Sequence, residues 1–234
     1  MALVGVPLVS TTQKQIILIY KPIKMTTTGI RIAFCGTSGS GKSTMARVVA
    51  NALGLDYTEN SAGLLLNQDQ QDMLVKKYGW TKSGHQDVIR LSNINPGFAW
   101  DFQWELLKTR ARFIRETQSF VIDRSPVDNL TYFLLQTAHL VPEIDCDRFV
   151  TAAQEALQPI THLIFFPAVF DQIEINGSRI SNWHYQSMVS GVFSNTIDSY
   201  FRNGFGLDFK FLVYGKRDFE ARKKDVLEWI YRSV

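Results

Sequence analysis

The sequence predicts an α/β fold in which a parallel sheet carries helices on both faces. From residue 29 onward, short apolar runs alternate with longer segments of helical periodicity, which is typical of parallel strands joined by crossover helices. The 234 residues with 45% hydrophobic content suit one sizeable domain with a full core. A glycine-rich loop follows the first apolar run, at the strand end where such folds bind ligands.

Residues 1–28 stand apart from this pattern, and we treat them as an N-terminal extension to a domain that spans residues 29–234. Residues 15–20 are apolar enough for a strand, but they precede the expected first strand, and residues 24–28 are polar. Short segments of this kind at a chain end are often poorly ordered.

The first expected strand, residues 29–35, is short and largely apolar. The helix after the loop ends at Gly54, where a C-cap glycine belongs. Its apolar residues recur at helical spacing: Met45, Val48, Val49, Ala52 and Leu53.

The remaining elements follow in alternation. Strands are expected at residues 55–58, 119–123, 161–166 and 209–214. Helices are expected at residues 61–78, 98–118, 126–140, 182–202 and 218–231. Asn60 or Ser61 would cap the first of these helices, Pro126 suits a first helical turn, and Pro167 would stop a strand.

The glycine-rich loop matches the complete GxxxxGK[ST] pattern of a phosphate-binding loop. Its residues are Gly36, Thr37, Ser38, Gly39, Ser40, Gly41, Lys42 and Ser43, followed by Thr44. The glycines let successive N–H groups point at phosphate oxygens, Lys42 would reach the β- and γ-phosphates, and Ser43 would bind Mg²⁺. A simple Gly/Ser-rich turn is the alternative, but the strand–loop–helix order favours the phosphate site.

A second group of candidate residues follows the strand at 119–123. Asp123 suits the metal-binding carboxylate of a phosphotransfer site, although Asp123 or Ser125 would also suit a helix N-cap before Pro126. Arg124 would bind an acceptor phosphate or steady the carboxylate, and the alternative is a surface ion pair. Asp128 reads as a first-turn helix charge.

Glu59 ends the strand at 55–58 and is expected at the same sheet edge. A kinase that acts on a hydroxyl needs a carboxylate to accept its proton. Glu59 and Asp123 are both candidates for this base, and a solvated strand-end charge is the alternative for Glu59.

These residues together resemble the nucleoside and nucleotide kinases among P-loop proteins, with thymidylate kinases and deoxynucleoside kinases as the nearest types. The resemblance rests on Gly36–Thr44, Glu59 and Asp123-Arg124-Ser125. It implies a P-loop kinase-type sheet with a short lid, ATP as phosphoryl donor and Mg²⁺ held by Ser43 and Asp123.

The resemblance also assigns basic residues in two later segments of the chain. Arg179 would belong to the lid and close over the phosphates, with an ordinary glycine turn as the alternative. The lid is poor in arginine, which departs from many monophosphate kinases. Lys216 or Arg217 would stack on the adenine of ATP.

Residues 78–104 mix aromatic and basic side chains, which suits an acceptor that presents an unstacked base. We expect Trp100 and Trp104 to pack in the core at helical spacing. Trp80, His85 and Arg90, in a stretch expected to be rich in loops, are candidates for the acceptor site.

The leading hypothesis for the acceptor is the hydroxymethyl group of 5-hydroxymethyluracil in phage DNA. The general pattern resembles the virus-encoded, thymidylate-kinase-like enzymes that phosphorylate this base during thymidine hypermodification. A free deoxynucleoside monophosphate is the alternative acceptor, and a non-catalytic ATP-binding module is the alternative of another class. A guanine-reading NKxD segment is absent from the sequence, which disfavours a GTPase.

Composition sets the remaining expectations. The net charge of +3 is compatible with a polyanionic partner but too small to require one. Two cysteines, with no signal-peptide pattern and no span suited to a bilayer, predict a reducing, cytoplasmic setting, which is the host cytoplasm for a viral protein.

Overall fold

The computed structural model describes residues 29–59, 65–81, 85–168, 182–202, 210–213 and 218–233. The extension expected at residues 1–28, and the lid and adenine-side candidates Arg179, Lys216 and Arg217, lie outside the described residues.

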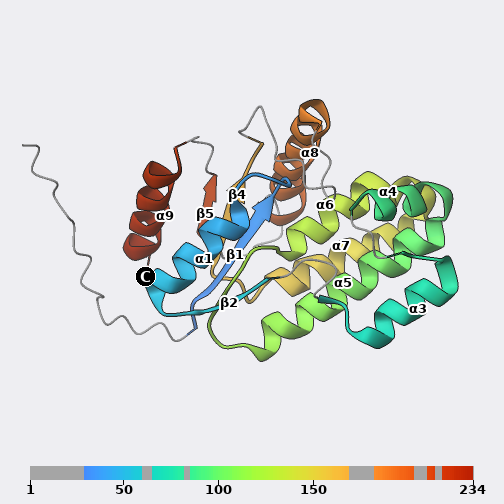
Figure 1. Ribbon diagram of the computed structural model, residues 1–234, viewed down its shortest axis with the longest axis horizontal. Helices are drawn as coiled ribbons and strands as arrows, with labels where there is room; N and C mark the ends of the chain where they lie inside the picture. Colours follow the sequence, from blue (N-terminus) through green and yellow to red (C-terminus); the bar gives the residue numbers. More distant parts are fainter. Residues whose placement is uncertain are drawn as a thin grey trace, which may run out of the picture.

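One parallel sheet runs through the described part of the chain (Figure 1). Its strands are β1 (Arg31–Gly36), β2 (Asp56–Thr58), β3 (Phe120–Ile122), β4 (His162–Phe166) and β5 (Lys210–Val213), in the order β2-β3-β1-β4-β5. Every pairing between them is parallel. The predicted fold class is therefore confirmed, and each predicted strand position holds to within two residues.

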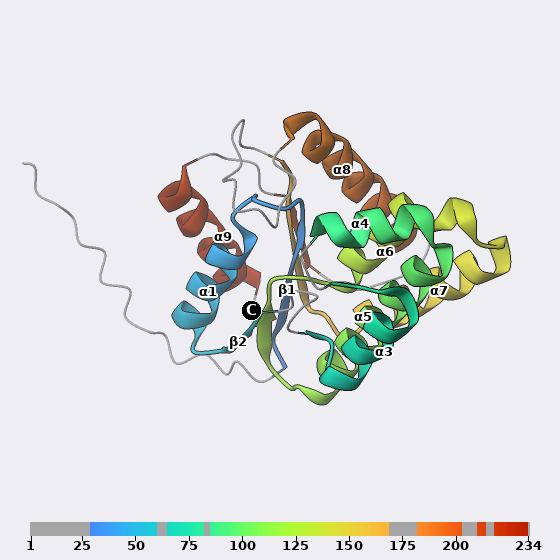
Figure 2. The same cartoon turned by 45° about the vertical axis from the view of Figure 1, so that its right-hand side comes forward.

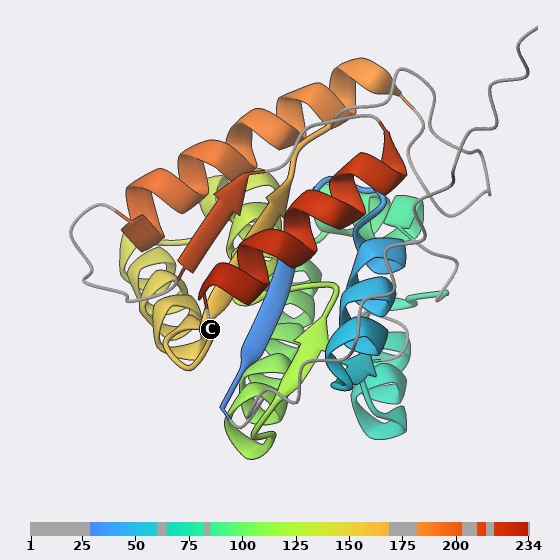
Figure 3. The ribbon, with the colours of Figure 1, turned by 90° about the vertical axis from the view of Figure 1, so that its left-hand side faces the viewer.

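Helices cover both faces of this sheet (Figure 2). They are α1 (Lys42–Leu53), α3 (Gln68–Tyr78), α4 (His85–Ile94), α5 (Pro96–Glu116), α6 (Pro126–Gln136), α7 (Glu143–Leu157), α8 (Trp183–Thr196) and α9 (Phe219–Ser233), with a 3-10 turn η1 (Ala138–Leu140) and a π-helical turn η2 (Ile197–Arg202). Helices α1 and α9 lie on one face, which Figure 3 views directly, and α5 to α8 lie on the other.

The central strand β1 shows why both faces are covered. Ile32 and Phe34 belong to the core shared with α1 and α9. Ala33 and Cys35 belong to the core shared with α5, α6 and α7. Side chains alternate between the faces of a strand, so a run that is apolar at every position requires burial on both sides.

Several helix boundaries differ from the predicted ones. The helix expected at residues 61–78 is interrupted at Leu66 and Asn67, and α3 begins at Gln68 behind a capping box of Asn67 with Gln70. The predicted start at residue 61 lies outside the described residues. The helix expected to reach residue 140 ends at Gln136 and gives way to η1. The buried stripe of α1 is also shifted: Met45 and Val49 are buried as expected, but Ala52 is exposed.

Helix α7 has no counterpart among the predicted elements. It begins after Pro142 without a side-chain cap, although Glu143 and Asp145 occupy its first turn. Its buried residues Phe149, Ala153 and Leu157 recur at helical spacing, so the signal was present in the sequence. Phe149 stacks on Phe133 of α6 at a ring separation of 4.1 Å, which ties α7 into the core.

In the part of the chain that the structure describes, no helix has the length and apolar character needed to cross a membrane.

The stacked phenylalanines predict a large effect of truncation. Phe149 is fully buried, so Phe149→Ala is expected to lower the free energy of unfolding by about 3–5 kcal/mol through lost burial and a residual cavity. Urea denaturation monitored by circular dichroism measures it. Ile144→Ala on the same helix, 65% exposed, is the matched control and should change stability little. Equal effects of the two variants would contradict the packing described for α7.

Candidate active site

The phosphate-binding loop joins β1 to α1 and is shaped by three glycines. Gly36 has a φ of 128°, and a Cβ there would lie 2.1 Å from the Phe166 carbonyl oxygen of β4, so only glycine fits. Gly39 and Gly41 also have positive φ values, 76° and 87°. Gly41 is the N-cap of α1 without a capping side chain. The backbone thus presents N–H groups and a helix N-terminus suited to an anion.

Lys42 is buried within this loop. Its ammonium donates a hydrogen bond to the Thr37 carbonyl and lies 3.4 Å from the Ser40 hydroxyl. Burial, and after it the positive charge of Arg124, lower the pKa of Lys42 to about 7, although Asp128 and Asp123 oppose this shift. A buried cation in this position is stabilised by the arrival of an anion.

Asp123 follows β3 and is buried at the same sheet edge. Its carboxylate accepts a hydrogen bond of 3.3 Å from the Tyr57 hydroxyl. Burial and the charge of Asp123 raise the pKa of Tyr57, so this tyrosine remains a donor at neutral pH. The prediction that Asp123 stands at the strand end beside the phosphate loop is consistent with this geometry.

Ser125 caps α6, as one of the alternatives for this stretch expected, and Asp128 of the first turn completes a capping box with it. The Ser125 hydroxyl accepts from the Val127 N–H at 3.2 Å, and Asp128 accepts from the Ser125 N–H at 2.8 Å. Asp128 also binds the Arg124 guanidinium at 3.1 Å. Burial would lower the pKa of Arg124, but Asp128 and Tyr132 outweigh it and raise that pKa. Arg124 therefore forms an ion pair, as one alternative expected, but the pair is partly buried and does not lie on the surface.

A buried polar group behind this cap was missed in the sequence. Arg110 of α5 donates to the Ser125 carbonyl at 3.3 Å and to the Asn129 side chain. Asn129 in turn donates to Gln103 at 3.4 Å. Burial lowers the pKa of Arg110 to about 10. The available signal was the occurrence of Gln103 and Arg110 on the apolar face of a long helix, where a polar side chain needs a partner.

The charges of this region do not balance. When Lys42 is protonated, three cations, Lys42, Arg110 and Arg124, stand with two carboxylates, Asp123 and Asp128, which leaves one excess positive charge among these described residues. A partly desolvated site with this imbalance favours an anionic ligand.

Ser43 and Asp123 suit Mg²⁺ in composition. Ser43 lies in the first turn of α1 and Asp123 is a buried carboxylate. No group of three or more His, Cys, Asp or Glu side chains in the described residues suits a metal by itself. Mg²⁺ commonly takes one or two protein oxygens and completes its shell with phosphates and water, so this donor set fits a metal that arrives with a nucleotide.

Glu59 lies at the predicted edge but in a different setting from Asp123. It follows Thr58, which is paired in register with Ile122, the residue before Asp123. Its carboxylate binds Arg47 of α1 at 3.0 Å, and both side chains are substantially exposed. The two candidate bases thus end neighbouring strands, one buried and one exposed.

The aromatic and basic residues expected to bind the acceptor are distributed differently. Trp80 is buried against Phe102, with ring centroids 5.5 Å apart, in a cluster of α3, α4 and α5. It is therefore a core residue, although it lies in the non-helical connection that follows α3. Arg90 pairs with Asp87 at 2.7 Å. The side chain of His85 lies outside the described residues.

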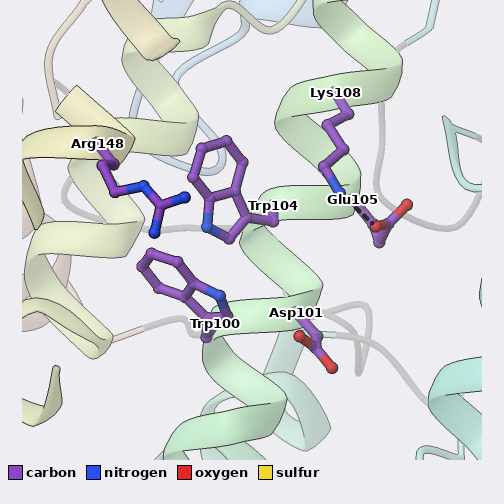
Figure 4. Close-up of a pocket in the computed structure, with 6 residues that line it drawn as sticks. All are labelled: Trp100, Asp101, Trp104, Glu105, Lys108 and Arg148. Carbon is purple, nitrogen blue, oxygen red and sulfur yellow. Dashed lines mark hydrogen bonds and ion pairs between the residues drawn. The ribbon is translucent and has the colours of Figure 1, made fainter. Parts of the chain in front are cut away.

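Trp100 and Trp104 pack against the main core, as predicted, and also line a surface pocket (Figure 4). The pocket has a volume of about 340 Å³, and Asp101, Glu105, Lys108 and Arg148 complete its lining. The two indole rings stand nearly perpendicular, with centroids 5.4 Å apart. None of the phosphate-loop or strand-end residues described above lines this pocket.

Comparison with known proteins identifies the fold. Nothing matches the chain in a scan of protein-family models or in a search of curated proteins. Among solved structures, deoxyadenosine kinase from M. mycoides with the products dCMP and a flexible dCDP is similar, with a TM-score of 0.57 at 12% identity, covering 87% of this chain and 99% of that one. The same kinase with bound dATP has a TM-score of 0.53 at 14% identity, covering 86% and 100%. The chain thus has the P-loop kinase fold.

The lowered pKa of Lys42 predicts proton uptake on nucleotide binding. Between pH 7 and the ordinary lysine pKa of 10.5, the amine of Lys42 is mostly deprotonated before nucleotide binds. The negative charge of bound phosphate raises the pKa of Lys42 again. At pH 8, binding of MgATP should take up about one proton per site. Calorimetry in two buffers of different ionisation enthalpy measures this uptake. A binding heat that is independent of the buffer would contradict the lowered pKa.

Proposed function

We propose that this protein is an ATP-dependent kinase that transfers the γ-phosphoryl group to a hydroxyl of a nucleoside-type or nucleotide-type acceptor. The observation that carries the proposal is the meeting of a complete phosphate loop, with its buried Lys42, and the pair Asp123-Arg124 at one sheet edge. The excess positive charge there suits a polyphosphate.

Each residue has a role that its chemistry supports. The loop residues Gly36–Ser43, with Thr44, would hold the phosphates of ATP, and Lys42 would neutralise charge that develops on the transferred group. Ser43 and Asp123 would hold Mg²⁺, which neutralises phosphate charge when it is bound. Arg124, fixed by Asp128, would steady the acceptor side. Arg179 as a lid residue and Arg217 at the adenine complete the proposal.

The similarity to deoxyadenosine kinase supports a nucleoside-type acceptor, since that protein is seen with dCMP and dATP. The hydroxymethyl group of 5-hydroxymethyluracil in DNA and a free deoxynucleoside monophosphate are finer alternatives. The burial of Trp80 removes one of the aromatic residues that favoured the DNA base. We therefore place nucleosides first.

A transfer assay with labelled ATP tests the proposal. The wild-type protein should label one class among nucleosides, free monophosphates and DNA that contains 5-hydroxymethyluracil. Lys42→Ala should reduce the rate at least ~10³-fold, because it removes a cation from the transferred group. Lys224→Ala, an exposed residue of α9, is the control and should retain full activity. Tight ATP binding without transfer to any acceptor would instead identify a non-catalytic ATP-binding module.

The identity of the base can be tested separately. If Glu59 accepts the acceptor proton, Glu59→Gln should lower kcat roughly 10²–10⁴-fold with little change in the KM for ATP. Asp123→Asn should lower the rate and also raise the Mg²⁺ concentration needed for half-maximal activity. Arg47→Gln removes the partner of Glu59 without removing a carboxylate and serves as the control. Full turnover by Glu59→Gln would exclude Glu59 and leave Asp123 as the base.

A further inference from the structure

Arg222, a buried arginine of α9, contacts the phosphate loop. Helix α9 lies on the face of the sheet opposite to α6, the helix that follows Asp123, Arg124 and Ser125. Its side chain is 1% exposed although it lies in the first turns of α9. Its Nη1 donates to the Ser40 carbonyl at 2.8 Å, across 182 residues of sequence. Burying a guanidinium costs free energy. Its burial against the backbone of a binding loop therefore suggests a role in that loop.

We propose that Arg222 is a positioning residue for ATP, and that it holds the phosphate loop in its anion-binding conformation. This inference rests on the proposed function of the loop. The peptide bond between Ser40 and Gly41 is trans. In a trans peptide the C=O and the following N–H point in opposite directions. Because Arg222 fixes the Ser40 carbonyl on its own side, the Gly41 N–H is directed to the other side.

The guanidinium is itself held in place by β4 and by the start of α9. It lies over the Phe166 ring, 5.2 Å from the centroid, a contact that favours a desolvated arginine. The α9 backbone is fixed at this point, since Asp218 accepts hydrogen bonds from the Ala221 N–H at 3.0 Å and, through its carbonyl, from the Arg222 N–H at 3.1 Å.

The fit of the loop against Arg222 is close. A Cβ added to Gly41 would lie 3.2 Å from Arg222 Nη1. The same β4 residue, Phe166, also sets the start of the loop, because its carbonyl excludes any side chain at Gly36. The loop is thus fixed at its first glycine by β4 and near its last glycine by α9.

This arrangement gives Arg222 a role that differs from that of Lys42. Lys42 lies within the loop and meets the phosphates, whereas Arg222 acts through the backbone and touches no ligand. Lysine at position 222 would keep the charge but would lose the planar fork that bonds Ser40 while stacking on Phe166.

The test measures ATP affinity, which requires no acceptor. Calorimetry with MgATP should show affinity at least 10-fold weaker for Arg222→Met than for the wild type, with partial recovery in Arg222→Lys. Arg232→Met, on an 82% exposed side chain of the same helix, is the matched control and should bind normally. Once the acceptor is known, its KM should be unchanged in Arg222→Met while kcat falls.

Thermal unfolding of each variant separates positioning from a general loss of structure. A fall in affinity per folded molecule supports the proposal, and ATP affinity within twofold of the wild type in folded Arg222→Met overturns it. If Arg222→Met does not fold, Arg222→Lys carries the same test, and wild-type affinity in it overturns the proposal. A wild-type protein that binds ATP but phosphorylates nothing would refute the proposed function without changing this comparison.

Discussion

The buried ammonium of Lys42 is the interaction on which the site depends. It donates hydrogen bonds to the loop that carries it, through the Thr37 carbonyl and the Ser40 hydroxyl. Nearby, Asp123 and Asp128 balance Arg110 and Arg124, so the charge of Lys42 is the one that these carboxylates do not offset. Such a site is costly when empty and gains most when a polyphosphate enters it.

The fold determines where this charge is placed. Parallel strands end at one edge, so β1, β2 and β3 bring the phosphate loop, Glu59 and Asp123 together. Helices on both faces then hold that edge from opposite sides. On one side α9 supplies Arg222 to the loop, and on the other α5 supplies Arg110 to the carbonyl of Ser125. The site is therefore supported by elements far from it in sequence.

The sequence was sufficient for the parts of the molecule that local chemistry decides. Strand order along the chain, the phosphate loop, the Ser125 cap and the glycine at the end of α1 each follow from residues within a few positions of one another. Long-range contacts could not be predicted in this way. Nothing near Trp80 indicates that Phe102 covers it, and nothing near Arg222 indicates Ser40, 182 residues earlier. Helix α7 was missed for another reason: its periodicity is clear, but it has no capping side chain.

The identity of the acceptor is the part of the proposal that the residues of a single short motif determine least. The loop and Asp123 concern the donor, whereas an acceptor is selected by side chains that several elements bring together. The buried set of Gln103, Arg110 and Asn129, which adjoins Ser125, belongs to α5 and α6 and was not apparent from either helix alone.

Thermal unfolding of wild-type protein and Lys42→Met, each with and without MgATP near pH 7, tests the central claim most directly. Removing a buried cation should make the ligand-free variant at least as stable as the wild type. MgATP at 100 times its Kd should stabilise only the wild type, by about 2.7 kcal/mol. The claim is that burial of the Lys42 cation is unfavourable until phosphate binds. It would be contradicted if Lys42→Met without nucleotide were clearly less stable than the wild type, or if MgATP stabilised both proteins equally.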